Sequence, residues 1–211
     1  MSDESQSRPT RIQQKNRGMI LEGALTVFSA QGFRGATIDQ IAEAAGLSKP
    51  NVLYYFASKE DIYRSLLTGL LDMWLDPMRR IDPEGDPLDE VRRYVATKLE
   101  MSRDYPRESR LFANEVLQGA PLLTEILGGQ LREMVEEASG VLQGWMDQGR
   151  LAQVDPHHLI FSIWALTQHY ADFEVQVRAV LGPGHDPYAE AGVFLERLYR
   201  NLLTVHPEEP R

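Results

Sequence analysis

The chain of 211 residues contains no cysteine. This absence excludes a disulfide framework, a thiolate metal site and a thiol nucleophile. Long apolar runs are also missing: the longest, such as residues 159–166, are far shorter than the roughly 20 residues that a membrane-spanning helix requires. No basic-then-apolar leader opens the sequence. We therefore expect a cytoplasmic protein that makes no contact with a membrane.

The sequence also lacks the motifs of nucleotide binding and covalent catalysis. It has no P-loop, no Gly-rich dinucleotide fingerprint and no serine nucleophile elbow. The glycines of GAPLL (119–123) and LGGQ (127–130) are typical of helix breaks. His157 and His158 are adjacent, so they would point apart on a helix and make a poor metal pair. We expect no enzyme activity, no cofactor and no metal.

Charge is distributed unevenly along the chain, whose net charge is -9. Residues 1–60 carry seven Lys or Arg against six Asp or Glu, and residues 61–211 carry fifteen against twenty-five. A near-neutral head on an acidic body is compatible with a protein that contacts phosphate through one end only.

Three short helices are predicted in the first part of the chain. The first covers 11–31 and ends at Gly32. Thr37 begins the second with a capping box, and Gly46 is expected to end it in the left-handed conformation. Ser48 caps the third helix, which has a proline in its first turn.

The remainder of the chain repeats one helix-start signal, an N-cap aspartate followed by an N1 proline, at Asp86, Asp155 and Asp186. No segment alternates with a period of two, so strands are not predicted. The fold class is therefore all-α, with about nine helices: a three-helix head and a larger bundle. The long amphipathic runs cover residues 88–102, 108–117, 122–149, 158–181 and 188–205.

A short helix, a Gly-centred turn and a second short helix with a polar tip indicate a helix-turn-helix. In that motif the second helix, here 48–55, lies in the major groove. Lys49 can donate to guanine O6 or N7, and Asn51 can pair with adenine. The same pattern fits an ordinary helical hairpin whose aromatic end is core. The predicted DNA-binding residues are Thr37, Ser48, Lys49, Pro50, Asn51, Tyr54, Tyr55 and Lys59.

Roles differ along this helix. Val52 and Phe56, four residues apart, are expected to face the core. Tyr54, Tyr55 and Lys59 would reach phosphate oxygens, as would the hydroxyl and backbone N–H of Thr37.

The stretch ATIDQIAEAAGLSKPNVLYYFASKEDIY, residues 36–63, resembles the DNA-binding segment of the TetR family of repressors. The resemblance implies a helix-turn-helix domain (11–57) and a ligand-binding and dimerisation domain (58–211), and the polar, aperiodic residues at the start of the chain predict a flexible arm (1–10). KLEMSRDYP, GAPLL and DPHHLIFSIWALTQHYADF are similar to members of the family that regulate pyrimidine use. This implies binding to operator DNA as a dimer and release by uracil or thymine.

A pyrimidine sensor needs an aromatic face for stacking and a donor–acceptor pair for the imide edge. Gln168 has both functions in one amide and lies four residues from Trp164. Trp74 lies at the far end of the long helix that leaves the head, so a shift at Trp74 would move the head as a lever. A kink at Pro77 would limit this lever to the first segment of the helix. An aromatic stripe is more often plain core, and Lys98 more often a solvated surface lysine. The predicted ligand-binding residues are Trp74, Lys98, Phe112, Trp164, Gln168 and Tyr170.

The last two long helices, 158–181 and 188–205, are expected to pair with their copies in a homodimer. Two-fold symmetry of the protein would then require a pseudo-palindromic double-stranded operator. One alternative is a repressor of this type with another effector, such as a dihydropyrimidine, another nucleobase or an unrelated small acid. Another is a helical small-molecule-binding or metabolic protein with no DNA role, which would have no need for an exposed Lys-Pro-Asn tip.

Overall fold

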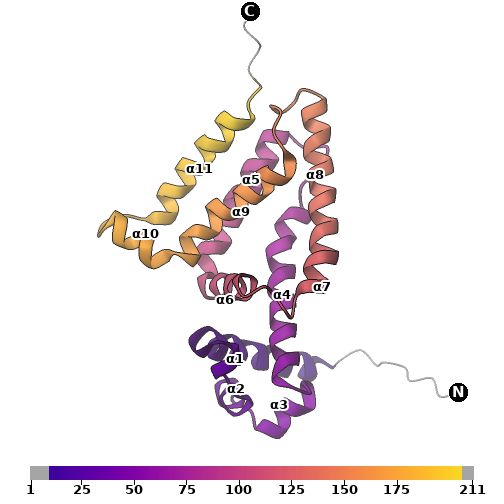
Figure 1. The fold of residues 1–211 in the computed structure, drawn as a ribbon, viewed down its shortest axis with the longest axis vertical. Coiled ribbons are helices and arrows are strands. Elements are labelled where there is room, and N and C mark those ends of the chain that lie inside the picture. Colours follow the sequence, from indigo (N-terminus) through magenta and orange to yellow (C-terminus); the bar gives the residue numbers. More distant parts are fainter. Residues whose placement is uncertain (1–9, 206–211) are drawn as a thin grey trace, which may run out of the picture. The chain divides into compact units, whose positions relative to one another are not determined.

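A computed structural model describes residues 10–205, and within this range it contains helices and no strands. The predicted all-α fold class is confirmed. The chain divides into two compact units, with the division between Gly69 and Leu70 (Figure 1). Most of the predicted arm, residues 1–9, lies outside the described residues.

The first unit contains α1 (Arg11–Gly35), α2 (Ile38–Ala45), α3 (Lys49–Tyr55) and the start of α4 (Lys59–Arg79). The α1 element is broken at Gly32, which has a φ of 70°. The sequence predicted an end at this residue.

The helix starts of the first unit are those that the sequence predicts. Thr37 and Gln40 form the capping box of α2, and Gly46 follows it with a φ of 66°. The Ser48 side chain caps α3. Glycine also permits close packing of α1 on α2, because a Cβ at Gly23 would lie 2.8 Å from the backbone nitrogen of Ala45.

The second unit begins within α4, which continues through Pro77 to Arg79, so the proline lies in the last turn. Asp86, Asp155 and Asp186 each cap a helix that has a proline in its first turn, as predicted. The remaining elements are α5 (Pro87–Asp104), α6 (Pro106–Leu117), α7 (Thr124–Ile126), the π-helical segment η1 (Leu127–Leu131), α8 (Arg132–Asp147), α9 (Pro156–Asp172), α10 (Glu174–Leu181) and α11 (Pro187–Leu203).

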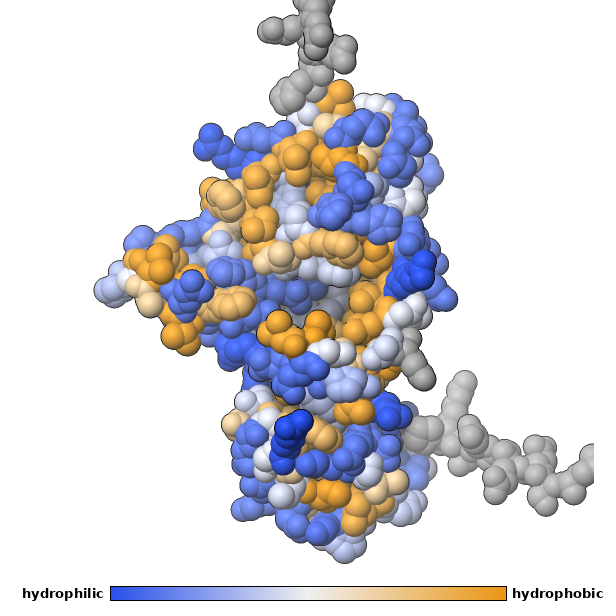
Figure 2. All heavy atoms as spheres, in the orientation of Figure 1, coloured by the Kyte–Doolittle hydropathy of each residue, from blue (hydrophilic) through white to orange (hydrophobic). Residues whose placement is uncertain are grey.

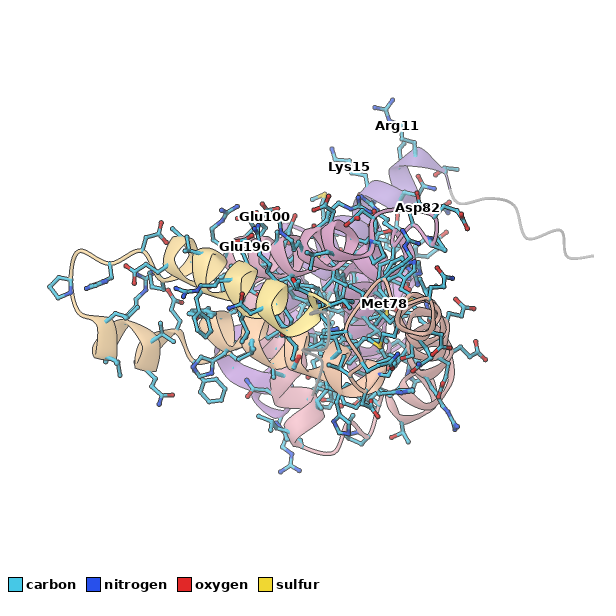
Figure 3. The ribbon with its side chains drawn as sticks, turned by 90° about the horizontal axis from the view of Figure 1, so that it is seen from above. Arg11, Lys15, Met78, Asp82, Glu100 and Glu196 are labelled. Atoms are coloured by element: carbon cyan, nitrogen blue, oxygen red, sulfur yellow. The ribbon has the colours of Figure 1, made fainter. Side chains whose placement is uncertain are left out.

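The core of the second unit is formed mainly by α5, α8, α9 and α11. Figure 3 places Met78 among the packed side chains of the bundle and Glu196 of α11 at its edge. No helix of the described residues is long and apolar enough to cross a membrane.

Two long helices predicted from the sequence are divided in the structure, so the described range holds more helices than the predicted nine. The run 122–149 is interrupted by η1, which contains two adjacent glycines that weaken a regular helix. The run 158–181 is interrupted at Phe173.

The break at Phe173 has a tertiary cause. Arg110 of α6 donates to the carbonyl oxygen of Ala171 at 3.1 Å, and Ser109 donates to the Asp172 carboxylate at 2.6 Å. These contacts with α6 stabilise the end of α9. Because they join residues about 60 positions apart, no local pattern could have revealed them.

Candidate functional site

The tip of α3 presents small polar groups, as the sequence predicts. Ser48 Oγ accepts from the backbone N–H of Asn51 at 3.4 Å, which fixes the first turn. Lys49 and Pro50 are exposed, and Asn51 is half-buried. The Lys49 ammonium lies 2.9 Å from a carboxylate oxygen of Asp39 on α2, so the cation at the tip already has an anionic partner within the head.

The C-terminal end of α3 is held by α1. Val52 and Phe56 are buried, as their spacing predicts. Asn16 donates to the Tyr55 hydroxyl at 2.9 Å, and Arg17 donates to the Tyr55 carbonyl at 3.1 Å. The Arg17 guanidinium also lies 4.3 Å from the centre of the Phe56 ring. These contacts fix the orientation of α3 in the head.

The two tyrosines of α3 therefore differ. Tyr54 is 72% exposed, and its hydroxyl is free to meet a phosphate. The hydroxyl of Tyr55 accepts from Asn16. It retains its own proton for donation, so a phosphate contact is compatible with its structural role.

Lys59 and Thr37 already make hydrogen bonds within the head: the bonds of Lys59 were not predicted from the sequence, whereas that of Thr37 belongs to the predicted capping box. Lys59 donates to the carbonyl oxygens of Phe33 at 2.8 Å and Ala36 at 2.9 Å, so its ammonium holds the connection between α1 and α2. The backbone N–H of Thr37 donates to the Gln40 side chain at 2.9 Å. A phosphate at Thr37 would have to replace that bond.

In the second unit, α4 and α5 bring Trp74 and Lys98 together. Lys98 is only 2% exposed, so its expected position as a solvated surface lysine is wrong. Lys98 lies on the apolar face of α5, four residues after Tyr94 and three after Val95, and this spacing was the signal that its side chain is buried. Its ammonium lies 4.7 Å from the centre of the Trp74 ring and donates to the Trp74 carbonyl at 3.4 Å.

This pair has unused hydrogen-bonding capacity. Burial lowers the pKa of Lys98 to about 7, and no carboxylate among the described residues pairs with it. The indole N–H of Trp74 is buried and has no hydrogen-bond partner in the described part of the protein. Buried donors are normally satisfied, so an unpaired indole N–H beside an ammonium that makes one hydrogen bond would suit a further acceptor.

The other predicted ligand-binding residues are distributed over the same unit. Trp164 donates its indole N–H to the Tyr94 hydroxyl at 2.7 Å and packs against the core. Tyr170 lies 6.1 Å from the Tyr188 ring. Phe112 and Gln168 are half-buried.

Sequence reasoning missed several residues that shape these sites. Tyr94 is buried on α5 and fixes Trp164, and its place on the apolar stripe was visible in the sequence. Asn16, Arg17 and Asp39 act across different helices, so the sequence carried no local signal for them. Among the described residues, no group of His, Asp and Glu is arranged to hold a metal ion.

Two family models match the chain. One, described as bacterial regulatory proteins of the tetR family, matches residues 20–66. The other, described as the C-terminal region of YcdC-like protein, matches residues 67–206. Together they cover both units.

Known proteins with similar sequences are transcriptional regulators. The HTH-type transcriptional regulator RutR of Escherichia coli is 52% identical over 163 residues, which is 77% of this chain and 77% of RutR. The HTH-type transcriptional repressor KstR2 of Mycobacterium tuberculosis is 31% identical over 101 residues, which is 47% of this chain and 50% of KstR2.

Solved structures match the fold. The structure of KstR2 from M. tuberculosis matches with a TM-score of 0.69 and 21% identity, covering 89% of this chain and 95% of that one. AibR, solved in complex with isovaleryl coenzyme A and operator DNA, matches with a TM-score of 0.68 and 16% identity, covering 87% of this chain and 97% of that one.

Proposed function

This chain belongs to the TetR family of bacterial transcriptional regulators, and we propose that it is a repressor released from its operator by a pyrimidine base such as uracil or thymine. Its relatives are DNA-binding regulators and not enzymes, which removes support from the alternative of a metabolic protein with no DNA role. The observation that carries the effector proposal is the buried contact between Lys98 and Trp74.

The tip of α3 is the proposed base-reading element. Asn51 would pair with adenine and Lys49 with guanine, while Tyr54 would contact phosphate. The firm attachment of Tyr55 and Phe56 to α1 supports this assignment, because a reading helix has to be held rigidly to discriminate bases.

The chemistry of a pyrimidine base suits the pair in the second unit. Uracil and thymine each carry two carbonyl oxygens beside ring N–H groups and present a flat face. Lys98 and Trp74 offer donors for a carbonyl oxygen, and the amide of Gln168 would bind the imide edge. Trp164 already donates its N–H to Tyr94, so we assign it the role of an aromatic wall.

Dimerisation through the last helices is supported by their exposed apolar side chains. Figure 2 shows hydrophobic residues on the visible face of α10 and α11. No residue of α10 is buried. Large exposed apolar side chains gathered on neighbouring helices support an interface at this face. The large exposed apolar residues of α9, α10 and α11, together with Phe173 between α9 and α10, are Phe161, Phe173, Val175, Val180, Val193, Phe194 and Leu202.

The helix α4 is the proposed route from effector to DNA. It begins at Lys59 in the first unit and carries Trp74 in the second. An effector that binds at Trp74 would favour one position of this helix and so shift the population of DNA-binding states. Regulation then needs only a difference in effector affinity between the two states.

Lys98 also favours one alternative effector. A buried ammonium without an acidic partner would bind a carboxylate as readily as a neutral carbonyl oxygen. A small acid, such as a carboxylated pyrimidine, is therefore the second candidate.

Thermal unfolding tests the effector proposal, because a ligand that binds only the folded protein raises the melting temperature. We expect a rise of several degrees with millimolar uracil or thymine and none with adenine. A rise with orotate alone would replace the neutral base by a small acid. If none of these compounds changed the melting temperature, the pyrimidine proposal would be wrong.

A further inference from the structure

Asp39 and Lys49 form an ion pair between the two helices of the helix-turn-helix. Asp39 lies in the first turn of α2, and Lys49 is the first residue of α3. The carboxylate and the ammonium are 2.9 Å apart, and their side chains remain 68% and 49% exposed. The pair therefore stands at the surface where α3 presents its tip, and either member can reach a bound molecule.

An exposed ion pair of this kind adds little to folding, because solvent and salt screen it. For DNA binding, the position of the ion pair matters more than its contribution to folding stability. A carboxylate beside a DNA-contacting lysine both occupies the ammonium and repels a phosphate that approaches it. A phosphate bound at the ammonium would lie well within the Debye length of roughly 8 Å from the carboxylate at physiological salt, so both effects persist under cellular conditions.

We propose that Asp39 limits the DNA affinity of the protein by competing with DNA for the Lys49 ammonium. This inference rests on the proposed contact between Lys49 and a base edge. Any DNA that engages Lys49 must first displace Asp39. A guanine in register with α3 offers the ammonium its O6 and N7 acceptors, whereas on a random duplex the ammonium meets mainly phosphates. The ion pair therefore opens on the operator and stays closed on other sequences.

The expected signature of removing the Asp39 carboxylate is a gain of affinity for DNA. Asp39→Asn frees Lys49 for phosphate contacts on any sequence, so affinity for a random duplex should rise by roughly fivefold to tenfold. Affinity for the operator should rise at least as much, because the variant has no ion pair to open before Lys49 reaches its base. The logarithm of the random-duplex binding constant should fall more steeply with the logarithm of salt concentration, by a slope of about one.

Two control variants separate this role from a general effect of charge. Glu43→Gln removes one negative charge from the same helix at an exposed position, and it should change random-duplex affinity by less than about twofold. Asp39→Glu keeps a carboxylate within reach of Lys49 and should retain the DNA affinities of the original protein. Thermal unfolding of each variant would show whether the loss of the acidic group from the first turn of α2 has loosened the head.

The decisive experiment is a double-mutant cycle, measured by fluorescence anisotropy on a random duplex and on an operator selected by the protein from a random library. If Asp39 acts through Lys49, Asp39→Asn should have no effect on random-duplex affinity in a Lys49→Ala background. An equal rise in that background, or an equal rise for Glu43→Gln, would overturn the proposal. So would a loss of affinity in Asp39→Asn.

The same cycle tests the underlying contact separately. If Lys49→Ala alone leaves the selected sequence and the operator affinity unchanged, the proposed base contact of Lys49 fails. If Lys49→Ala alters the preference but Asp39→Asn behaves like Glu43→Gln, the contact stands and only the competition by Asp39 is wrong.

Discussion

The ammonium of Lys98 lies over the indole ring of Trp74, 4.7 Å from its centre, and its single hydrogen bond among the described residues goes to the carbonyl of the same residue. A buried ammonium with three donors gains little compensation from one carbonyl and an aromatic face. The position therefore lowers stability, and we attribute its presence to function.

Replacing Lys98 should reveal how much folding stability its burial removes. Its pKa falls from 10.5 to about 7 in the folded protein, so between these values the unfolded chain binds a proton that the folded protein does not. Stability from this group therefore increases with pH across that window and is lowest at and below pH 7. Lys98→Met should raise the unfolding free energy by roughly 1–4 kcal/mol at pH 6.

Urea unfolding of both proteins at pH 6, 8 and 10 measures this effect. The advantage of Lys98→Met should shrink steadily as the pH rises toward 10, because the amine is then neutral in the folded protein and the unfolded chain begins to lose its proton as well. A difference that does not vary with pH would contradict the assignment of a buried, destabilised ammonium.

The unpaired indole N–H of Trp74 gives a second prediction. Trp74→Phe keeps an aromatic face but removes a donor that has no partner in the described structure. Trp145→Phe is the matched control, because that indole N–H donates to the Pro83 carbonyl at 2.9 Å. Both variants lose similar volume, but Trp145→Phe should cost about 1 kcal/mol more in unfolding free energy.

Isothermal titration with uracil then separates function from folding. Trp74→Phe should weaken uracil binding by roughly tenfold, since it loses one hydrogen bond to the ligand, whereas Trp145→Phe should bind as the original protein does. Unchanged affinity in Trp74→Phe would remove this indole from the ligand site.

The residues of the head should divide into base readers and phosphate contacts. Asn51→Ala should relax base preference at one operator position, at a cost of about 1–3 kcal/mol. Tyr54→Phe should weaken binding to all sequences alike. Selection from a random duplex library reads both effects, and an unchanged preferred sequence in Asn51→Ala would show that this side chain does not read a base.

Lys59 is expected to behave differently from the other DNA-binding candidates. Its ammonium holds two backbone carbonyls of the α1–α2 connection, so Lys59→Met should lower the melting temperature of the protein. A normal melting temperature with reduced salt dependence of DNA binding would instead restore the original expectation of a phosphate contact.

A charge introduced into the proposed interface on α11 should prevent dimerisation. Phe194 is 56% exposed on the proposed interface, so Phe194→Glu should give a monomer in analytical ultracentrifugation and weaken operator binding at least tenfold. Leu117→Glu is the control, since Leu117 is even more exposed but lies at the end of α6. If both variants remained dimeric, the interface would lie elsewhere.

The sequence was informative where structure is local. The capping residues Thr37, Ser48 and Asp86 act on backbone within three residues, and each begins a helix as predicted. The end of α9 at Phe173 depends on Ser109 and Arg110 of another helix, so no window along the chain contains its cause.

The candidate sites show the same division. The polar tip of α3 could be predicted because its residues are consecutive. The burial of Lys98 was visible in its spacing from Tyr94 and Val95, but the general preference of lysine for solvent pointed the other way. The partnership of Asp39 with Lys49 depends on how α2 and α3 pack and could be seen only in three dimensions.

Release from operator DNA is the strongest test of effector-controlled repression. The operator selected by the protein would be labelled, and its dissociation constant measured with saturating uracil, thymine, cytosine or no addition. We predict that uracil and thymine raise the constant at least tenfold, which corresponds to about 1.4 kcal/mol of coupling between the two sites, and that cytosine does not. An operator affinity unchanged by uracil and thymine would contradict the proposal that this regulator responds to pyrimidines.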